Sequence, residues 1–222
     1  MSETAPSLDE IEPLVVNAVG AATPEARTLL QGLGEFLHIA RSPQAAELEP
    51  GEVTELGDYA LQLLHRLALE DPGGAQSWGP AALAAARWVM ERGGRLQTLE
   101  PVVDALAARA NRLRDPAELG RIADFMERVI GACAQSVRAD LEVANPGRPW
   151  RLLHINRAIA ATRSLDPERM ERAFEALTAA LPHDAPEFFH EAMREMDRVG
   201  YPEHVRERVA HYHARWTRPR TN

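Results

Sequence analysis

Two Glu-x-x-His pairs contain the residues of this chain that are best spaced for metal chemistry, Glu35 with His38 and Glu187 with His190. In carboxylate-bridged di-metal proteins built in helical bundles, such pairs point inward and supply half of the site. A helix turns by about 100° per residue, which places each pair opposite the apolar face of its own predicted helix. We therefore interpret both pairs as solvated helix surface, and we predict no metal site and no cofactor.

The residue types that are missing exclude several kinds of enzyme. All 25 basic residues are arginines, which is typical of a GC-rich genome and leaves no lysine for a phosphate-binding loop or a Schiff base. The single cysteine, Cys133, excludes an internal disulfide and multi-cysteine zinc or iron–sulfur sites within one chain. It falls on the apolar face of a predicted helix, as a small buried hydrophobe does. No coherent catalytic set remains, so the sequence favours a protein that is not an enzyme.

Composition predicts a globular chain in a reducing compartment. Hydrophobic residues make up 45% of the 222 residues and charged residues 26%, which are ordinary globular values. The longest apolar stretch, Ala81 to Met90, is too short to cross a bilayer and contains Arg87. The acidic first residues lack the pattern of a signal peptide, and one cysteine fits a cytoplasmic location.

Charge is unevenly distributed along the chain. The net charge is −8, and residues 1–150 hold 13 arginines against 22 acidic residues, a net charge of −9. An acidic surface repels phosphate backbones, so duplex nucleic acid is not an expected partner.

Prolines and capping residues mark where helices begin. Thr23, Asp115 and Asp166 each precede a proline, as N-cap residues do, and Asp184 followed by Glu187 matches the capping-box pattern. Between these marks, apolar residues recur every three or four positions. The pattern predicts ten helices, near 13–22, 24–41, 52–70, 80–93, 99–114, 116–143, 149–163, 167–181, 185–199 and 202–216.

The last four helices begin at a regular spacing of 17 or 18 residues. Two such helices form a hairpin of about the length of a tetratricopeptide-type repeat, which the period resembles. The signature differs, because alignment on Trp150 puts His154 at the glycine position and Asp166 at the alanine position. We predict an all-α fold of stacked antiparallel helical pairs, α-solenoid-like or a right-angle array, with no sheet.

One helical domain is expected over residues 13–216. A sub-boundary could fall in the loop 144–149, and flexible segments are expected at 1–12 and 217–222.

The helix at 149–163 has apolar residues on two sides, so it should be covered on two sides. Trp150, His154 and Arg157 project near one another from it. Polar groups in a buried helix need partners, which gives two readings. In the first reading, Arg157 and His154 are tied to neighbouring carboxylates and carbonyls. In the second, Arg157 and Trp150 form an anion pocket.

The last helix has a narrow apolar stripe of Val205, Val209, Tyr212 and Trp216, which suits an end cap packed on one neighbour. Arginines flank the stripe, and Arg206, Arg208 and Arg215 are candidate partner-binding residues. Three interpretations stay open: a solubilising end cap, a rim that docks an acidic partner, and a rim that folds back onto the acidic body.

These features favour a helical protein–protein interaction module, with an acidic protein as one possible partner. Self-association is compatible with the sequence. The alternative is a small helical ligand-binding protein or enzyme with an anion pocket around the helix 149–163.

Overall fold

The computed structural model describes residues 5–20, 22–71, 74–141 and 143–217. They form eleven α-helices and one 3-10 helix. Across this described part there is no sheet, and the only strand-like pairing is an isolated bridge between Leu96 and Cys133. Within the same residues, no helix is both long and apolar enough to traverse a membrane.

Backbone contacts divide the chain into two compact units, Met1–Arg112 with Arg128–Asn145, and Leu113–Glu127 with Pro146–Asn222. The helix α6 (Pro116–Ala132) runs through the boundary. The first unit also holds α1 (Leu8–Val19), α2 (Pro24–Ala40), η1 (Pro43–Ala46), α3 (Pro50–Glu70), α4 (Gly74–Glu91), α5 (Glu100–Arg112) and α7 (Gln135–Arg138). The second holds α8 (Pro149–Arg163), α9 (Pro167–Ala180), α10 (Ala185–Val199) and α11 (Glu203–Thr217). Within each unit, helices that follow one another pack in pairs, among them α1 with α2, α8 with α9 and α10 with α11, so the predicted all-α fold of sequential helical pairs is confirmed.

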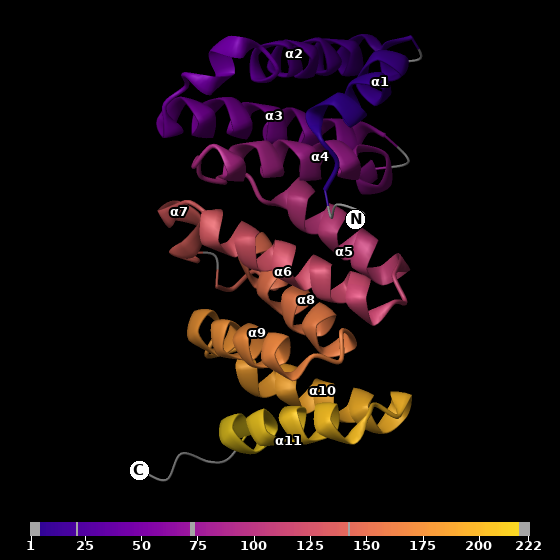
Figure 1. The fold of residues 1–222 in the computed structure, drawn as a ribbon, viewed down its shortest axis with the longest axis vertical. Helices are drawn as coiled ribbons and strands as arrows, with labels where there is room; N and C mark the ends of the chain where they lie inside the picture. Colours follow the sequence, from indigo (N-terminus) through magenta and orange to yellow (C-terminus); the bar gives the residue numbers. More distant parts are fainter. Residues whose placement is uncertain (1–4, 21, 72–73, 142, 218–222) are drawn as a thin grey trace. The chain divides into compact units, whose positions relative to one another are not determined.

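Small residues let the helices of the first unit approach closely. Helices α2, α3 and α4 lie side by side, and α1 packs on α2 (Figure 1). In α4 every residue from Ala81 to Ala86 is buried, because neighbouring helices cover it on more than one side. Gly57 of α3 faces Val89 of α4, where an added Cβ would lie 2.1 Å from a valine methyl carbon.

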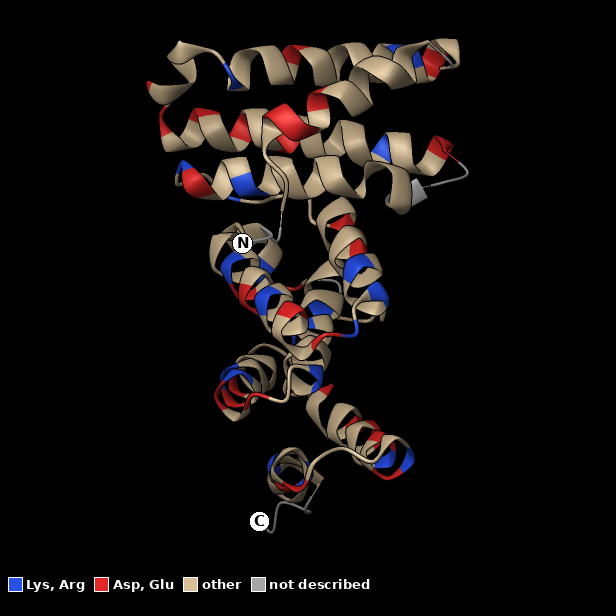
Figure 2. Ribbon diagram, turned by 45° about the vertical axis from the view of Figure 1, so that its right-hand side comes forward, with Lys and Arg blue, Asp and Glu red and all other residues tan. Residues whose placement is uncertain are grey.

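The second unit has its own core, in which aromatic rings of three helices meet. Phe174 of α9, Phe189 of α10 and Tyr212 of α11 are fully buried, and the Phe189 and Tyr212 rings stack with centroids 5.3 Å apart. Val205 and Val209 of α11 also lie in this core, as the apolar stripe predicted for the last helix requires. Acidic and basic residues are interspersed on the helices that lead to the C-terminus (Figure 2).

Helix boundaries differ clearly from the sequence prediction in three places. The helix predicted to begin at Pro80 begins at Gly74, so Pro80 lies inside α4. The first helix begins at Leu8 and not at 13, because Ser7 and Glu10 form a capping box. It therefore occupies part of the segment 1–12 that was expected to be flexible, whereas residues 1–4 and 218–222 lie outside the described residues.

The helix predicted over 116–143 ends at Ala132. Arg138 turns back and donates to the carbonyl oxygens of Gly131 at 2.6 Å and Cys133 at 3.0 Å, which satisfies acceptors at the helix end. A short separate helix, α7, follows.

Candidate functional site

Helix α8 is buried on the side of Trp150, but its other apolar side is partly open, with Ile159 44% exposed, so the expected cover on both sides is wrong. Trp150, His154 and Arg157 are each less than a tenth exposed and share one side of it. The Trp150 and His154 rings meet edge to face with centroids 4.5 Å apart. The three candidate residues are therefore brought together, but in the interior of the unit.

Arg157 already has a carboxylate partner. Its Nη2 lies 2.8 Å from Oε1 of Glu127 on α6. Burial lowers the pKa of Arg157, and the charge of Glu127 opposes that effect. The geometry matches the reading in which the arginine is tied to a neighbouring carboxylate.

His154 is held without polar contacts. Neither ring nitrogen has a hydrogen-bond partner among the described residues. Burial, helped by the nearby charge of Arg157, lowers the pKa of His154 to about 4. The imidazole is therefore neutral at pH 7 and packs against Trp150 as a largely apolar ring.

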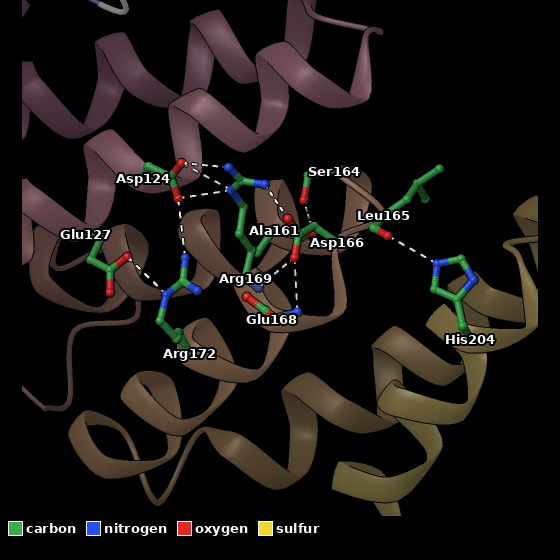
Figure 3. A network of polar contacts seen from close by, with 10 residues as sticks. All are labelled: Asp124, Glu127, Ala161, Ser164, Leu165, Asp166, Glu168, Arg169, Arg172 and His204. Atoms are coloured by element: carbon green, nitrogen blue, oxygen red, sulfur yellow. Dashed lines mark hydrogen bonds and ion pairs between the residues drawn. The ribbon is translucent and has the colours of Figure 1, made fainter.

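A network of polar contacts that includes Glu127 joins α6 to α9 (Figure 3). Arg169 donates to both carboxylate oxygens of Asp124, at 3.0 to 3.1 Å, and also pairs with Asp166, the N-cap residue of α9. Arg172 lies 3.6 Å from Asp124 and from Glu127. These charges neutralise one another, so the network holds helices together and offers no vacant cation for an anion.

The opposite side of α8 lines a groove. By helical geometry, Ile155, Ile159 and Arg163 lie about 130–170° around the helix from the buried trio, and Arg151 lies about 90° from it. Together with α10 they line a cavity of about 520 Å³. This groove lies wholly within the second unit, and we refer to it as the α8–α10 groove.

Apolar side chains form the floor of the α8–α10 groove. Ile159 is 44% exposed although it is a large aliphatic residue. The other floor residues are Ile155, Phe188, Ala192 and Met196. The only small side chain among them, Ala192, leaves room at the middle of the α10 side.

Charged residues form the two rims. Glu187, Glu191 and Glu195 stand on the α10 side, and Arg151 and Arg163 stand at the two ends of the α8 side. Glu191 and Glu195 pair with arginines one turn further along α10, and the hydrogen bonds from Arg198 lower the pKa of Glu195. Glu187 has no hydrogen bond or ion pair among the described residues.

Asp184 does not cap α10 as its sequence position predicted. Its carboxylate instead accepts from Arg151 Nε at 2.5 Å and from Arg148 Nη2 at 3.2 Å. Burial raises the pKa of Asp184, but the two arginines outweigh burial and leave the pKa below its ordinary value. Because the capping box does not form, Glu187 is available to the groove.

The three arginines predicted on α11 each pair within the second unit. Arg206 donates to the Met196 carbonyl oxygen at 2.7 Å and to Asp197 at 2.8 Å. Arg208 lies 3.2 Å from Glu171, and Arg215 lies 2.9 Å from Glu175. They do not converge on one place, and whether they also bind a partner stays a prediction.

The Glu-x-x-His residues are exposed, as helical geometry predicted. Within the described ranges, no group of three or more His, Cys, Asp or Glu side chains is arranged to hold a metal ion. The Cys133 thiol is buried, and burial raises its pKa to about 12 despite the charge of Arg138.

The α8–α10 groove was not predicted from the sequence. Ile155 and Ile159 were recognised as one apolar side of their helix, and the pattern alone implied that a neighbour covers that side. The signal that could have found the groove is the row Glu187, Glu191 and Glu195, which repeats every four residues beside an apolar face. No protein-family model, curated protein or solved structure matches the chain.

Proposed function

We propose that this chain is a helical protein-binding module and that its second unit receives a segment of another protein in the α8–α10 groove. The observation that carries the proposal is the apolar floor, with Ile159 left 44% exposed between charged rims. Contiguous exposed apolar surface with a polar rim is typical of a site that another molecule covers.

The chemistry of the lining also supports binding. The polar lining consists of carboxylates, guanidinium groups and the hydroxyl-bearing residues Thr162 and Tyr201, and it contains no cysteine, serine or histidine. Aliphatic and aromatic side chains on the floor supply contact area and desolvation, which dominate the free energy of association.

The alternative of an anion pocket around α8 has less support. Arg157, which would bind the anion, is buried and already paired with Glu127. An incoming anion would have to displace that carboxylate from a site with little access to water.

A matched pair of substitutions tests the proposal. Ile159→Glu places a charge on the groove floor, and Ile39→Glu places one on α2, where the isoleucine is 42% exposed. Both positions are exposed, so each change should alter the free energy of unfolding by only about 0.5 kcal/mol.

The unchanged chain and both variants would be tagged and used as bait in a lysate of the source cells, with recovered proteins quantified by mass spectrometry. We expect at least one protein whose recovery falls with Ile159→Glu and stays unchanged with Ile39→Glu. Recovery of the same proteins in the same amounts by all three baits would show that the groove is not the binding surface.

A further inference from the structure

We infer that the occupant of the α8–α10 groove is an amphipathic helix of another protein, with basic residues along the flank that faces α10. This inference rests on the proposed function and adds the conformation and charge of the partner segment. It follows from the length of the groove, from the helical backbone of its two walls and from the negative charge of its α10 rim.

The length of the groove suits about three helical turns. Arg151 and Arg163 mark its ends on α8, and a rise of about 1.5 Å per residue separates them by about 18 Å. On α10 the lining runs from Glu187 to Met196, which spans about 14 Å by the same rise. A helix of this length carries three or four apolar residues on one stripe, enough to cover the floor.

The backbone around the groove favours a helix over an extended segment. Both walls are helices, whose mid-helix amide and carbonyl groups bond within the helix and cannot pair with an added strand. An extended peptide would therefore set its own amide groups over an apolar floor without partners, which is costly. A helix satisfies those groups internally and presents only side chains.

The α10 rim sets the charge of the partner. Glu187, Glu191 and Glu195 are four residues apart, so they form one row with steps of about 6 Å. Basic residues repeated every four positions on the partner helix would face this row. Arg194 and Arg198, the present partners of two of these glutamates, are 70% and 72% exposed, and such exposed pairs exchange at little cost.

The arginines on the α8 side of the groove do not require a matching row of acidic residues on the partner helix. Arg151 is held by Asp184, and Arg163 donates to the Leu113 carbonyl oxygen at 2.7 Å, so both are already engaged. They stand only at the ends of the groove. The charge met along the middle of the occupant is therefore negative.

A second copy of this chain is a poor source for such a helix. Helix α11 has the required stripe and flanking arginines, but Val205, Val209 and Tyr212 are buried in the core of its own unit. Helix α1 carries Asp9 and Glu10 in its first turn, which the glutamate row would repel. Neither helix suits the groove, and we therefore infer a partner segment from a different protein.

A displayed library of random peptides, which can supply helical and extended segments alike, tests the inference with the full chain as target. Peptides that also bind the Ile159→Glu protein are removed, which leaves those that need the groove. We expect the remaining sequences to share apolar residues spaced by three and four, and arginine or lysine along one flank. Ala192→Trp, which fills the groove without adding a charge, should abolish binding of the same peptides.

The strongest peptide would then be synthesised and its affinity measured by calorimetry. Replacing Glu187, Glu191 and Glu195 with glutamine should weaken binding about tenfold, as loss of several exposed pairs predicts. The matched control replaces Glu35, Glu47 and Glu55, which are exposed glutamates of the first unit, and should leave binding unchanged. A proline at the centre of the solvent-facing side of the peptide should also weaken binding at least tenfold, because it breaks a helix.

The possible failures are distinguishable. Groove-dependent peptides that are proline-rich, extended or acidic would overturn the inference and leave the proposed function standing. The same applies if the unchanged chain dimerises and Ile159→Glu makes it monomeric, because a second copy would then be the occupant. Peptides enriched equally on the Ile159→Glu protein would overturn both.

Discussion

Arg151 at the start of α8 donates a 2.5 Å hydrogen bond from Nε to Asp184, which immediately precedes α10. Arg148, which is 4% exposed, donates to the other oxygen of the same carboxylate. One carboxylate thus fixes the beginnings of both helices that form the α8–α10 groove.

We predict that Asp184→Asn lowers the free energy of unfolding by about 1–3 kcal/mol, because the buried guanidinium of Arg148 loses a charged partner. The matched control is Asp197→Asn, which removes an exposed pair with Arg206 and should cost no more than about 1 kcal/mol. Urea unfolding at pH 7 measures both. Equal losses for the two variants would mean that Asp184 has no special role at the groove.

His154 should make stability depend on pH. Its pKa is about 4 in the folded chain and 6.5 ordinarily, so the unfolded chain binds the proton more readily. The free energy of unfolding should therefore fall as the pH is lowered from about 6.5 to 4, by up to about 3 kcal/mol. Asp184 contributes at lower pH, because its lowered pKa means that its stabilisation is lost only below about pH 4.

The variant His154→Leu should remove most of that dependence. It should be at least as stable as the unchanged chain at pH 7, because it eliminates two buried nitrogens that lack partners. Unfolding by urea at several pH values gives the comparison. An identical decline between pH 6.5 and 4 in both proteins would show that another group is responsible.

Local sequence signals were sufficient to predict most of the fold. Thr23 and Asp166 cap helices as their positions before prolines indicated, and Gly200 ends α10 in the left-handed conformation. Such signals act over a few residues, so they can be read from one chain. The early start of α1 depends on Ser7 and Glu10, which form the same kind of local box and could have been recognised.

The groove depends on contacts that are distant in sequence and have no local signature. Asp184 has the same neighbours in sequence as a capping residue, yet two arginines more than thirty positions earlier take its carboxylate. Likewise, Ile159 sits in a periodic apolar pattern that cannot show whether a neighbour covers it. Only the packing of α8 beside α10 decides which apolar side stays open.

Tyr212 should contribute much more to stability than the arginines beside it on α11. Its ring is 2% exposed and stacks on Phe189, and its hydroxyl donates to Glu175 at 2.7 Å. Tyr212→Ala should cost about 3–5 kcal/mol, whereas Arg206→Ala with Arg208→Ala should cost about 1–2 kcal/mol in total. Thermal and urea unfolding compare them, and similar losses would mean that the arginine pairs are structural ties.

Gly57 gives the sharpest test of helix packing in the first unit. Alanine is intrinsically favoured over glycine in a helix by about 1 kcal/mol, so an isolated α3 would gain from Gly57→Ala. In the folded chain the new Cβ would lie 2.1 Å from a methyl carbon of Val89, and α4 would have to move. Overpacking of this kind costs about 1–3 kcal/mol, so we expect a net loss of stability.

The companion change Val89→Ala makes the cause of that loss measurable. Alone, it should destabilise the chain by leaving a cavity beside Gly57, because Val89 is fully buried. In the double variant with Gly57→Ala, the new methyl group at position 57 no longer meets the valine methyl group that Val89→Ala removes. The double variant should therefore be more stable than the sum of the two single effects predicts. Strictly additive effects would contradict direct contact between these two positions, since residues that share a packing site are coupled.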